Sequence, residues 1–294
     1  MYKSMYDILN KSFDYDCEYK KLWEMIFSRR YYLYNSRSYT LIGLFNKFIV
    51  CWKYKGTKCS SQEIIKELEI EEKPKENIEE AILKLCDFIV NIREFLVFEK
   101  NKIDYQIKLG IKQDEYYITE EEMGETIFMQ DKILIDLVSE ILNSLNYEVV
   151  KEEDYKCFIV KKNVDAEETA KIVEEDDISN QILQYNDYRI VKDREAKKAI
   201  LKSLADYFEG HRKEIKDSNS DLENNISFAL NNFDIRHNNI TGRYENSFMK
   251  NISEKEVIEL YDKTYFLMLI AFRLIALKNF ENEVEEIRRN EFKK

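Results

Sequence analysis

The sequence predicts a mainly α protein, a multi-helix chain with small β-hairpins in its middle. Its 294 residues include one proline and six glycines, fewer than the tight turns of a β-sandwich or barrel require. Hydrophobic residues make up 44% of the chain, and they recur every three or four positions, as on one face of a helix. No apolar run approaches the roughly 20 residues that cross a bilayer, so we expect no membrane partner.

The first residues and the cysteines indicate a cytoplasmic protein. Residues 1–16 lack the apolar core of a signal peptide and carry three acids, so nothing suggests export. The five cysteines include no pair at CxxC spacing, and the chain has two histidines. We therefore expect reduced thiols, no metal and no other cofactor.

Residues 1–60 form a basic and aromatic helical region. They hold eleven Lys or Arg against five Asp or Glu, although the whole chain has a net charge of −11. Aromatic and apolar residues four apart predict two or three helices within 1–55, with a loop at Tyr34–Tyr39: Tyr19, Trp23 and Phe27, then Leu44, Phe48 and Trp52. Basic and aromatic side chains together can bind nucleic acid, but amphipathic side chains at the border of a core give the same composition, and we favour that interpretation.

Residues 60–110 resemble a winged helix. Ser60 and Glu63 form a possible capping box at the start of one helix, and a second helix follows from Ile78. Phe95–Phe98 and Asp104–Lys108 are predicted as the two strands of a hairpin. Because the second helix begins with acids, which repel DNA, we expect a structural or protein-binding role for this segment.

Residues 119–175 complete the N-terminal region, which spans 1–175. Thr119 and Glu122 form another possible capping box, ahead of a helix that stops near Asn146. Tyr147–Val150 and Cys157–Val160 predict a β-hairpin. Its acids and lysine, Glu148, Asp154 and Lys156, could form a metal-dependent nuclease site, although solvated turn residues explain them more simply. The acidic stretch at 174–177 marks the predicted domain boundary.

Residues 176–294 predict a helical bundle. A helix at Asp193–Phe208 ends at Gly210, and its outer face is predicted to be basic. A further helix covers Leu222–His237, a loop covers Asn238–Glu254, and a long final helix leads to a charged tail after Asn282. The predicted basic residues on the first of these helices are Lys192, Arg194, Lys197, Lys198 and Lys202.

The chemistry is concentrated in residues 231–242. His237 lies at or near the buried face of its predicted helix, Asn232 and Arg236 form an i,i+4 pair, and Arg243 follows. A titratable imidazole beside guanidinium groups suits attack on an RNA phosphate, because histidine can move the proton of a 2′-hydroxyl or leaving oxygen. Arginine can stabilise the charge that develops on phosphorus, so no metal is required.

This segment resembles the site of the HEPN superfamily, which includes metal-independent ribonucleases and abortive-infection proteins of bacteria. The resemblance covers residues 178–285. The family pattern is an arginine, a polar residue, three to five others and a histidine. Asn231 occupies the arginine position, Asn232 the polar position and His237 the histidine position. Arg236 could replace the missing arginine from the next turn.

The resemblance implies a ribonuclease effector of antiphage defence that cleaves RNA by 2′-hydroxyl attack. It also implies a homodimer, because two copies of the family motif commonly face one shared cleft. The catalytic candidates are His237, Arg236, Asn231 and Asn232, and the RNA-binding candidates are Arg243, Lys197 and Lys198.

A second hypothesis is a non-catalytic HEPN-like subunit that regulates, or binds a protein partner in, a defence or toxin–antitoxin complex. The absence of the family arginine at Asn231 favours it, whereas the adjacent Arg236 and His237 favour the enzyme. A structural interpretation of His237 also stands, as a histidine that caps the end of a helix. The abundance of Lys, Glu, Ile and Asn is typical of a bacterium with an AT-rich genome.

Overall fold

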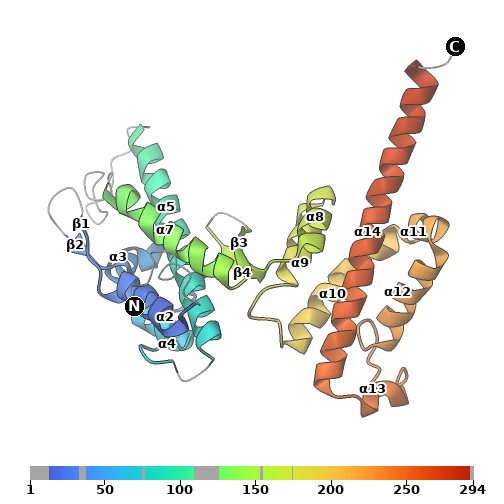
Figure 1. The fold of residues 1–294 in the computed structure, drawn as a ribbon, viewed down its shortest axis with the longest axis horizontal. Coiled ribbons are helices and arrows are strands. Elements are labelled where there is room, and N and C mark those ends of the chain that lie inside the picture. The colour runs from blue at the N-terminus through green and yellow to red at the C-terminus, as the bar shows by residue number, and fades with distance from the viewer. Residues whose placement is uncertain are drawn as a thin grey trace, which may run out of the picture. The chain divides into compact units, whose positions relative to one another are not determined.

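The structure is a computed structural model that describes residues 13–32, 38–74, 77–108, 126–152, 155–173 and 175–291. Figure 1 shows that helices dominate the chain, which confirms the predicted fold class. The chain divides into two compact units, Met1–Ile159 and Val160–Lys294. This division precedes the boundary predicted near residue 175, because the helix after Val160 packs within the C-terminal unit.

The N-terminal unit consists of helices and two small sheets (Figure 1). Its described elements are α2 (Tyr15–Phe27), β1 (Tyr31–Tyr32), β2 (Ser38–Tyr39), α3 (Leu41–Phe48), two 3-10 turns (Ile49–Cys51 and Lys53–Lys55), α4 (Ser61–Glu67), α5 (Ile78–Lys108), α7 (Thr126–Ser144), β3 (Tyr147–Lys151) and β4 (Cys157–Lys161), whose last two residues belong to the C-terminal unit.

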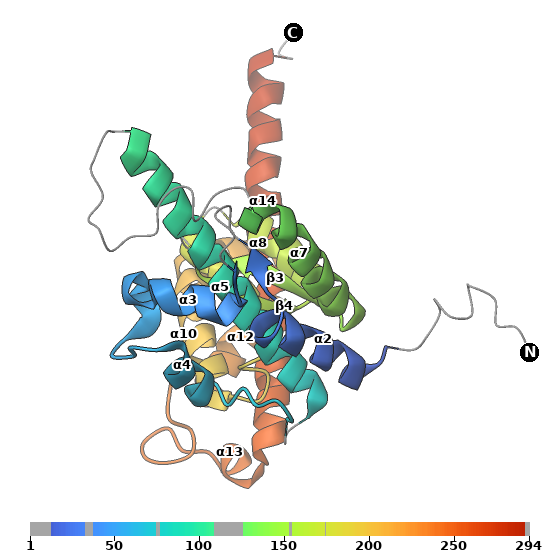
Figure 2. The same ribbon diagram turned by 90° about the vertical axis from the view of Figure 1, so that its left-hand side faces the viewer.

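The prediction of a winged-helix hairpin at Phe95–Phe98 and Asp104–Lys108 is wrong. Figure 2 shows α5 as one unbroken helix through both segments. Phe95 and Leu96 are buried one turn after Ile92, so this apolar run belongs to the helical stripe that packs into the core. The sequence between Ile78 and Lys108 contains no glycine or proline that would end the helix.

Several local predictions for this unit are confirmed. The Ser60 side chain accepts a hydrogen bond from the Glu63 amide at 3.4 Å, as a capping box requires. The predicted hairpin forms as β3 and β4, and Asn91 of α5 exchanges two hydrogen bonds with the backbone of Cys157. Of the residues considered for a nuclease site, Lys156 forms an ion pair with Glu152, and Asp154 lies outside the described residues.

Two further predictions for this unit concern the loop at 34–39 and the capping box at Thr119 and Glu122. The predicted loop at 34–39 ends in the strand β2, which pairs antiparallel with β1. The predicted capping box at Thr119 and Glu122 lies outside the described residues.

The C-terminal unit is a bundle of helices around one hydrophobic core, as predicted. Its elements are α8 (Val164–Ile172), α9 (Asp176–Gln184), α10 (Arg194–Gly210), α11 (Arg212–Ser218), α12 (Ser220–Asn232), α13 (Ser247–Asn251) and α14 (Glu254–Glu291). Helices α8, α10, α11 and α12 pack against α14, and the largest fully buried side chains of this core are Tyr261, Phe208 and Phe272. None of the helices in the described residues is both long and apolar enough to cross a membrane.

Helix boundaries in this unit differ from the prediction at three places. Helix α12 ends at Asn232, well before His237, because Asp234 adopts a left-handed conformation with φ of 60° that stops a helix. The predicted loop at 238–254 contains the short helix α13. Helix α14 continues to Glu291, through the segment predicted as a charged tail.

Candidate functional site

The candidate site is the loop Phe233–Asn246, which leaves the end of α12 and leads into α13. The helix end is closed by the Phe233 amide, which donates to the carbonyl of Ala229 at 2.9 Å. The amide of Arg236 then reaches back to the carbonyl of Leu230 at 3.0 Å. These bonds satisfy carbonyls of the last turn that a helix end leaves open.

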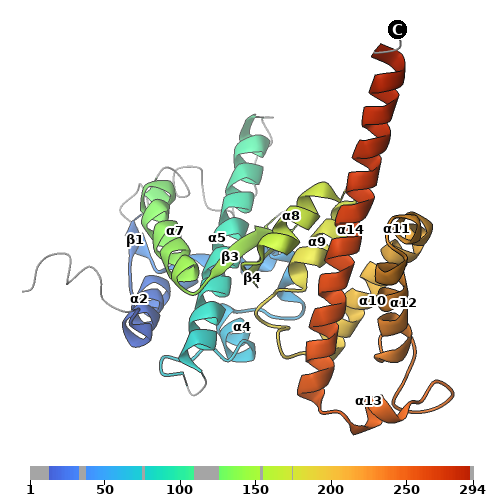
Figure 3. The same cartoon turned by 45° about the vertical axis from the view of Figure 1, so that its right-hand side comes forward.

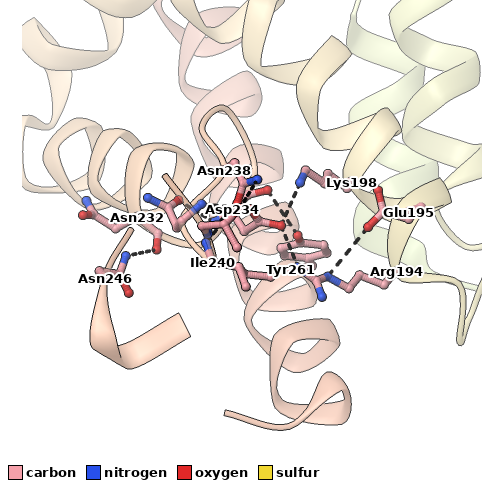
Figure 4. A network of polar contacts seen from close by, with 11 residues as sticks. Arg194, Glu195, Lys198, Asn232, Asp234, Asn238, Ile240, Asn246 and Tyr261 are labelled. Atoms are coloured by element: carbon pink, nitrogen blue, oxygen red, sulfur yellow. Dashed lines mark hydrogen bonds and ion pairs between the residues drawn. The ribbon is translucent and has the colours of Figure 1, made fainter. Parts of the chain in front are cut away.

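Asp234 anchors the loop from within the bundle. Its side chain is 3% exposed, and one carboxylate oxygen, Oδ2, accepts from Arg194 Nη2 at 2.6 Å and from Lys198 Nζ at 2.7 Å. Figure 4 shows both cations reaching it from α10. Burial alone would raise the pKa of Asp234, but the bonds from Lys198, the Asn239 amide and Arg194 outweigh it and lower that pKa.

Asn239 closes the loop against Asp234. The Asp234 amide donates to Asn239 Oδ1 at 2.8 Å, and the Asn239 amide donates to Asp234 Oδ1 at 3.0 Å. Asn239 Nδ2 also donates to the carbonyl of Tyr244 at 2.8 Å. Asn246 adds two more bonds, from its amide to Asn239 O at 2.9 Å and from Nδ2 to Asn232 O at 3.1 Å. The loop backbone is therefore fixed by buried polar contacts.

Tyr261 of α14 lies beneath this network (Figure 4). Its ring is fully buried, and its hydroxyl donates to the carbonyl of Asp234 at 3.5 Å. Burial raises the pKa of Tyr261 to about 12. The next loop residue, Ile235, is also fully buried, so the first turn of the loop is attached to the core by both polar and apolar contacts.

His237 lies on the outer part of this loop and is half-buried. Its imidazole stacks on the Tyr244 ring, with 4.2 Å between the ring centroids and 17° between their planes. The guanidinium of Arg243 lies 5.6 Å from the centre of the same Tyr244 ring. Because Tyr244 and Arg243 are both exposed, an imidazole and a cation are available together at the surface.

Arg236 is directed differently from its neighbour His237. Its Nη1 donates to Glu209 Oε1 at 2.6 Å, and its Nη2 donates to the carbonyl of Ala205 at 3.2 Å. Both acceptors belong to α10, so this guanidinium joins the loop to the bundle. The Glu209 carboxylate offsets its charge.

The remaining predicted site residues lie in separate places. Asn231 is exposed on α12, and Asn232 donates from Nδ2 to the carbonyl of Phe228 at 2.9 Å. Lys197 is not on an outer basic face as predicted: it is 5% exposed, and its Nζ donates to Asp262 Oδ1 at 2.5 Å. Lys198 is similarly engaged with Asp234. Both lysines turn inward because acids on other elements pair with them.

Sequence reasoning did not identify Asp234, Asn239 or Tyr244 as part of the site. The only local signal for the first two is the tolerance of Asp and Asn for left-handed backbone and turns. Tyr244 could have been noticed as an aromatic residue next to Arg243. In the described parts of the chain, no three His, Cys, Asp or Glu side chains converge as a metal site requires.

Comparison with family models, curated proteins and solved structures finds no match to this chain. The resemblance to the HEPN superfamily therefore stays a prediction that rests on the residues of segment 231–242.

Proposed function

We propose that this protein is a HEPN-type, metal-independent ribonuclease that acts in bacterial antiphage defence. The observation that carries the proposal is the stacked pair of His237 and Tyr244, with Arg243 against the same phenol ring. The loop that presents them is fixed from below by Asp234 and Asn239. A fixed imidazole at the surface is suited to general acid–base catalysis on a bound substrate.

The proposed reaction uses only groups of this chain and of the RNA. A His237 imidazole accepts the proton of a ribose 2′-hydroxyl, and the 2′-oxygen attacks the adjacent phosphorus. The bond from phosphorus to the 5′-oxygen breaks, that oxygen takes up a proton, and a 2′,3′-cyclic phosphate remains. The second proton transfer needs a separate acid, which His237 of a second copy would supply in a homodimer.

Arg243 is the better candidate to stabilise the phosphate charge, although Arg236 was the first choice from the sequence. Arg236 already donates to Glu209 and Ala205, whereas Arg243 is exposed beside the imidazole stack. We therefore assign Arg243 to the phosphate and Arg236 to holding the loop on α10.

The test compares His237→Ala with His211→Ala. His211 is the second histidine of the chain, is partly exposed, and lies 3.3 Å from Glu214 through Nδ1. With a short labelled single-stranded RNA, His237→Ala should reduce cleavage by roughly 10²–10⁴-fold, while His211→Ala should retain it. The products should carry cyclic phosphates, a chelator should have no effect, and 2′-O-methyl RNA should stay intact.

Thermal melting of both variants separates chemistry from folding. Full cleavage by a folded His237→Ala protein, or cleavage of 2′-O-methyl RNA, would overturn the proposed mechanism.

The alternative function is a non-catalytic regulatory or partner-binding subunit of a defence complex. A specific observation favours it: the family arginine is replaced by Asn231, and Arg236 is committed to Glu209. This alternative predicts no cleavage of any RNA by the purified protein. It also predicts that His237→Ala changes only its stability.

A further inference from the structure

The last part of α14 extends beyond its packed neighbours in the C-terminal unit (Figure 3). The stripe of α14 that faces the core ends at Ile275. From Leu277 to Glu291 every residue is exposed except Val284, which is half-buried. Isolated helices of this length are marginal in water, so a free segment of this kind needs an additional source of stability.

This segment carries an apolar seam, defined here as Leu277, Phe280, Val284 and Ile287. Their spacings of three, four and three match positions a and d of a heptad repeat. Leu277, Phe280 and Ile287 are 52%, 60% and 47% exposed. The seam lies on the face opposite the core stripe, because Leu277 is about 200° around the helix from Ile275.

We propose that the seam is the interface of a two-stranded parallel coiled coil with a second copy of this chain. In a parallel pair, identical seam residues meet across the two-fold axis. Phe266 and Ile270 fall at positions d and a of the same register and are also exposed, but Arg273 holds the d position before Leu277 and bonds to α8, so the seam begins at Leu277.

The charged residues beside the seam also indicate that its partner is a second copy of this chain. With Leu277 and Val284 at position a, Glu283 falls at position g and Arg288 at position e. A parallel coiled coil places a g residue next to the e residue of the following heptad in the other strand. Glu283 would therefore lie beside Arg288 of the partner subunit, and the two-fold axis creates this ion pair twice.

The length of the seam determines how tightly two copies are expected to associate. Two heptads are fewer than the three or four of a stable coiled coil, so we expect a reversible dimer that depends on protein concentration. This interface uses none of the proposed catalytic residues. The proposed ribonuclease also needs a second copy, so association is measured here by light scattering and catalysis separately by RNA cleavage.

The first experiment is light scattering of the full chain over a wide range of concentration. The wild type should shift from monomer to dimer, and Leu277→Lys with Val284→Lys should weaken the dimer at least about tenfold, because an ammonium cannot be buried in the seam without cost. Asn282→Lys is the matched control on the opposite, exposed face of α14 and should dimerise normally. Circular dichroism melting should show all three proteins equally folded.

Charge reversal and crosslinking test the arrangement. Glu283→Arg or Arg288→Glu alone should weaken the dimer, and the two together should restore it. In a background with the exposed cysteines changed, Cys17→Ser and Cys59→Ser, Val284→Cys should form a disulfide-linked dimer under mild oxidation, whereas Asn282→Cys should not. A monomeric wild type at every concentration overturns the proposal, as does a dimer that the two seam lysines leave intact. Failure of Val284→Cys to crosslink overturns the parallel arrangement.

Discussion

The loop Phe233–Asn246 and the end of α14 both leave the core of the C-terminal unit, but they are held in different ways. The loop has irregular backbone, and its amides and carbonyls are bonded by Asp234, Asn239 and Asn246. The end of α14 is helical and satisfies its own backbone, so its conformation requires no such contacts. Its apolar seam, however, remains exposed to water.

This difference predicts which property, monomer stability or association, a mutation should change in each region. In the loop, the important groups are buried, polar and charged, and removing one leaves others without partners. In the end of α14, the important groups are exposed and apolar, and removing one should leave the folded monomer unchanged. Stability measurements on the monomer and measurements of association therefore separate the two regions.

Among substitutions in the loop, the largest effect on stability is expected from Asp234→Asn. Asparagine tolerates the positive φ at this position, so the substitution removes the charge and leaves the backbone strain unchanged. Arg194 and Lys198 would then face a neutral amide, and the free energy of unfolding should fall by about 3 kcal/mol. Asp206→Asn, at an exposed acid of α10, is the control and should cost less than about 0.5 kcal/mol. Urea unfolding measures both, and equal values would show that the network does not stabilise the unit.

Acidification should remove the contribution of the Asp234 carboxylate to the stability of the wild type. The pKa of Asp234 is lowered in the folded protein, so its stabilisation is present above the unfolded value of about 3.9 and is lost as the pH falls through the folded value. The wild type should therefore lose more stability than Asp234→Asn between neutral pH and about pH 3. Parallel curves of unfolding free energy against pH for the two proteins would contradict the assignment.

A smaller effect is expected from Tyr261→Phe. This change keeps the buried ring and removes the hydroxyl that donates to the Asp234 carbonyl at 3.5 Å. A loss of about 1 kcal/mol is typical for one hydrogen bond. Hydrogen exchange should locate the change at the amides of the loop, and Tyr244→Phe, at an exposed ring, should leave those amides protected.

The smallest effect on stability is expected from Phe280→Ala. Phe280 is in the seam, so the unfolding free energy of the dilute monomer should change by less than about 0.5 kcal/mol. Its comparison is Phe272→Ala on the core stripe of the same helix, where the ring is 2% exposed and the loss should be about 3–5 kcal/mol. A large loss in dilute Phe280→Ala would mean that the seam is already covered within one chain.

The sequence alone was sufficient for features that depend on neighbours along the chain. Scarce proline and glycine and the three-to-four spacing of apolar residues indicate helices. Ser60 with Glu63 marks a helix start, and the segment from Tyr147 to Val160 marks a hairpin. Each of these depends on bonds or turns within a few residues. The strands predicted at Phe95–Phe98 and Asp104–Lys108 failed because a short apolar run fits a strand as well as a buried helix, and packing of α5 decided between them.

The tertiary structure decided where the charged groups of the candidate site point. Lys198 and Asp234 are 36 residues apart in the sequence, and Arg236 and Glu209 are 27 apart. No periodicity connects such pairs, so Lys197 and Lys198 were predicted on an outer face and Arg236 at the reacting phosphate. Folding brings acids of other elements beside them. A charge enclosed in the bundle is stable only with such a partner, and that requirement turned these three side chains inward and left His237, Tyr244 and Arg243 at the surface.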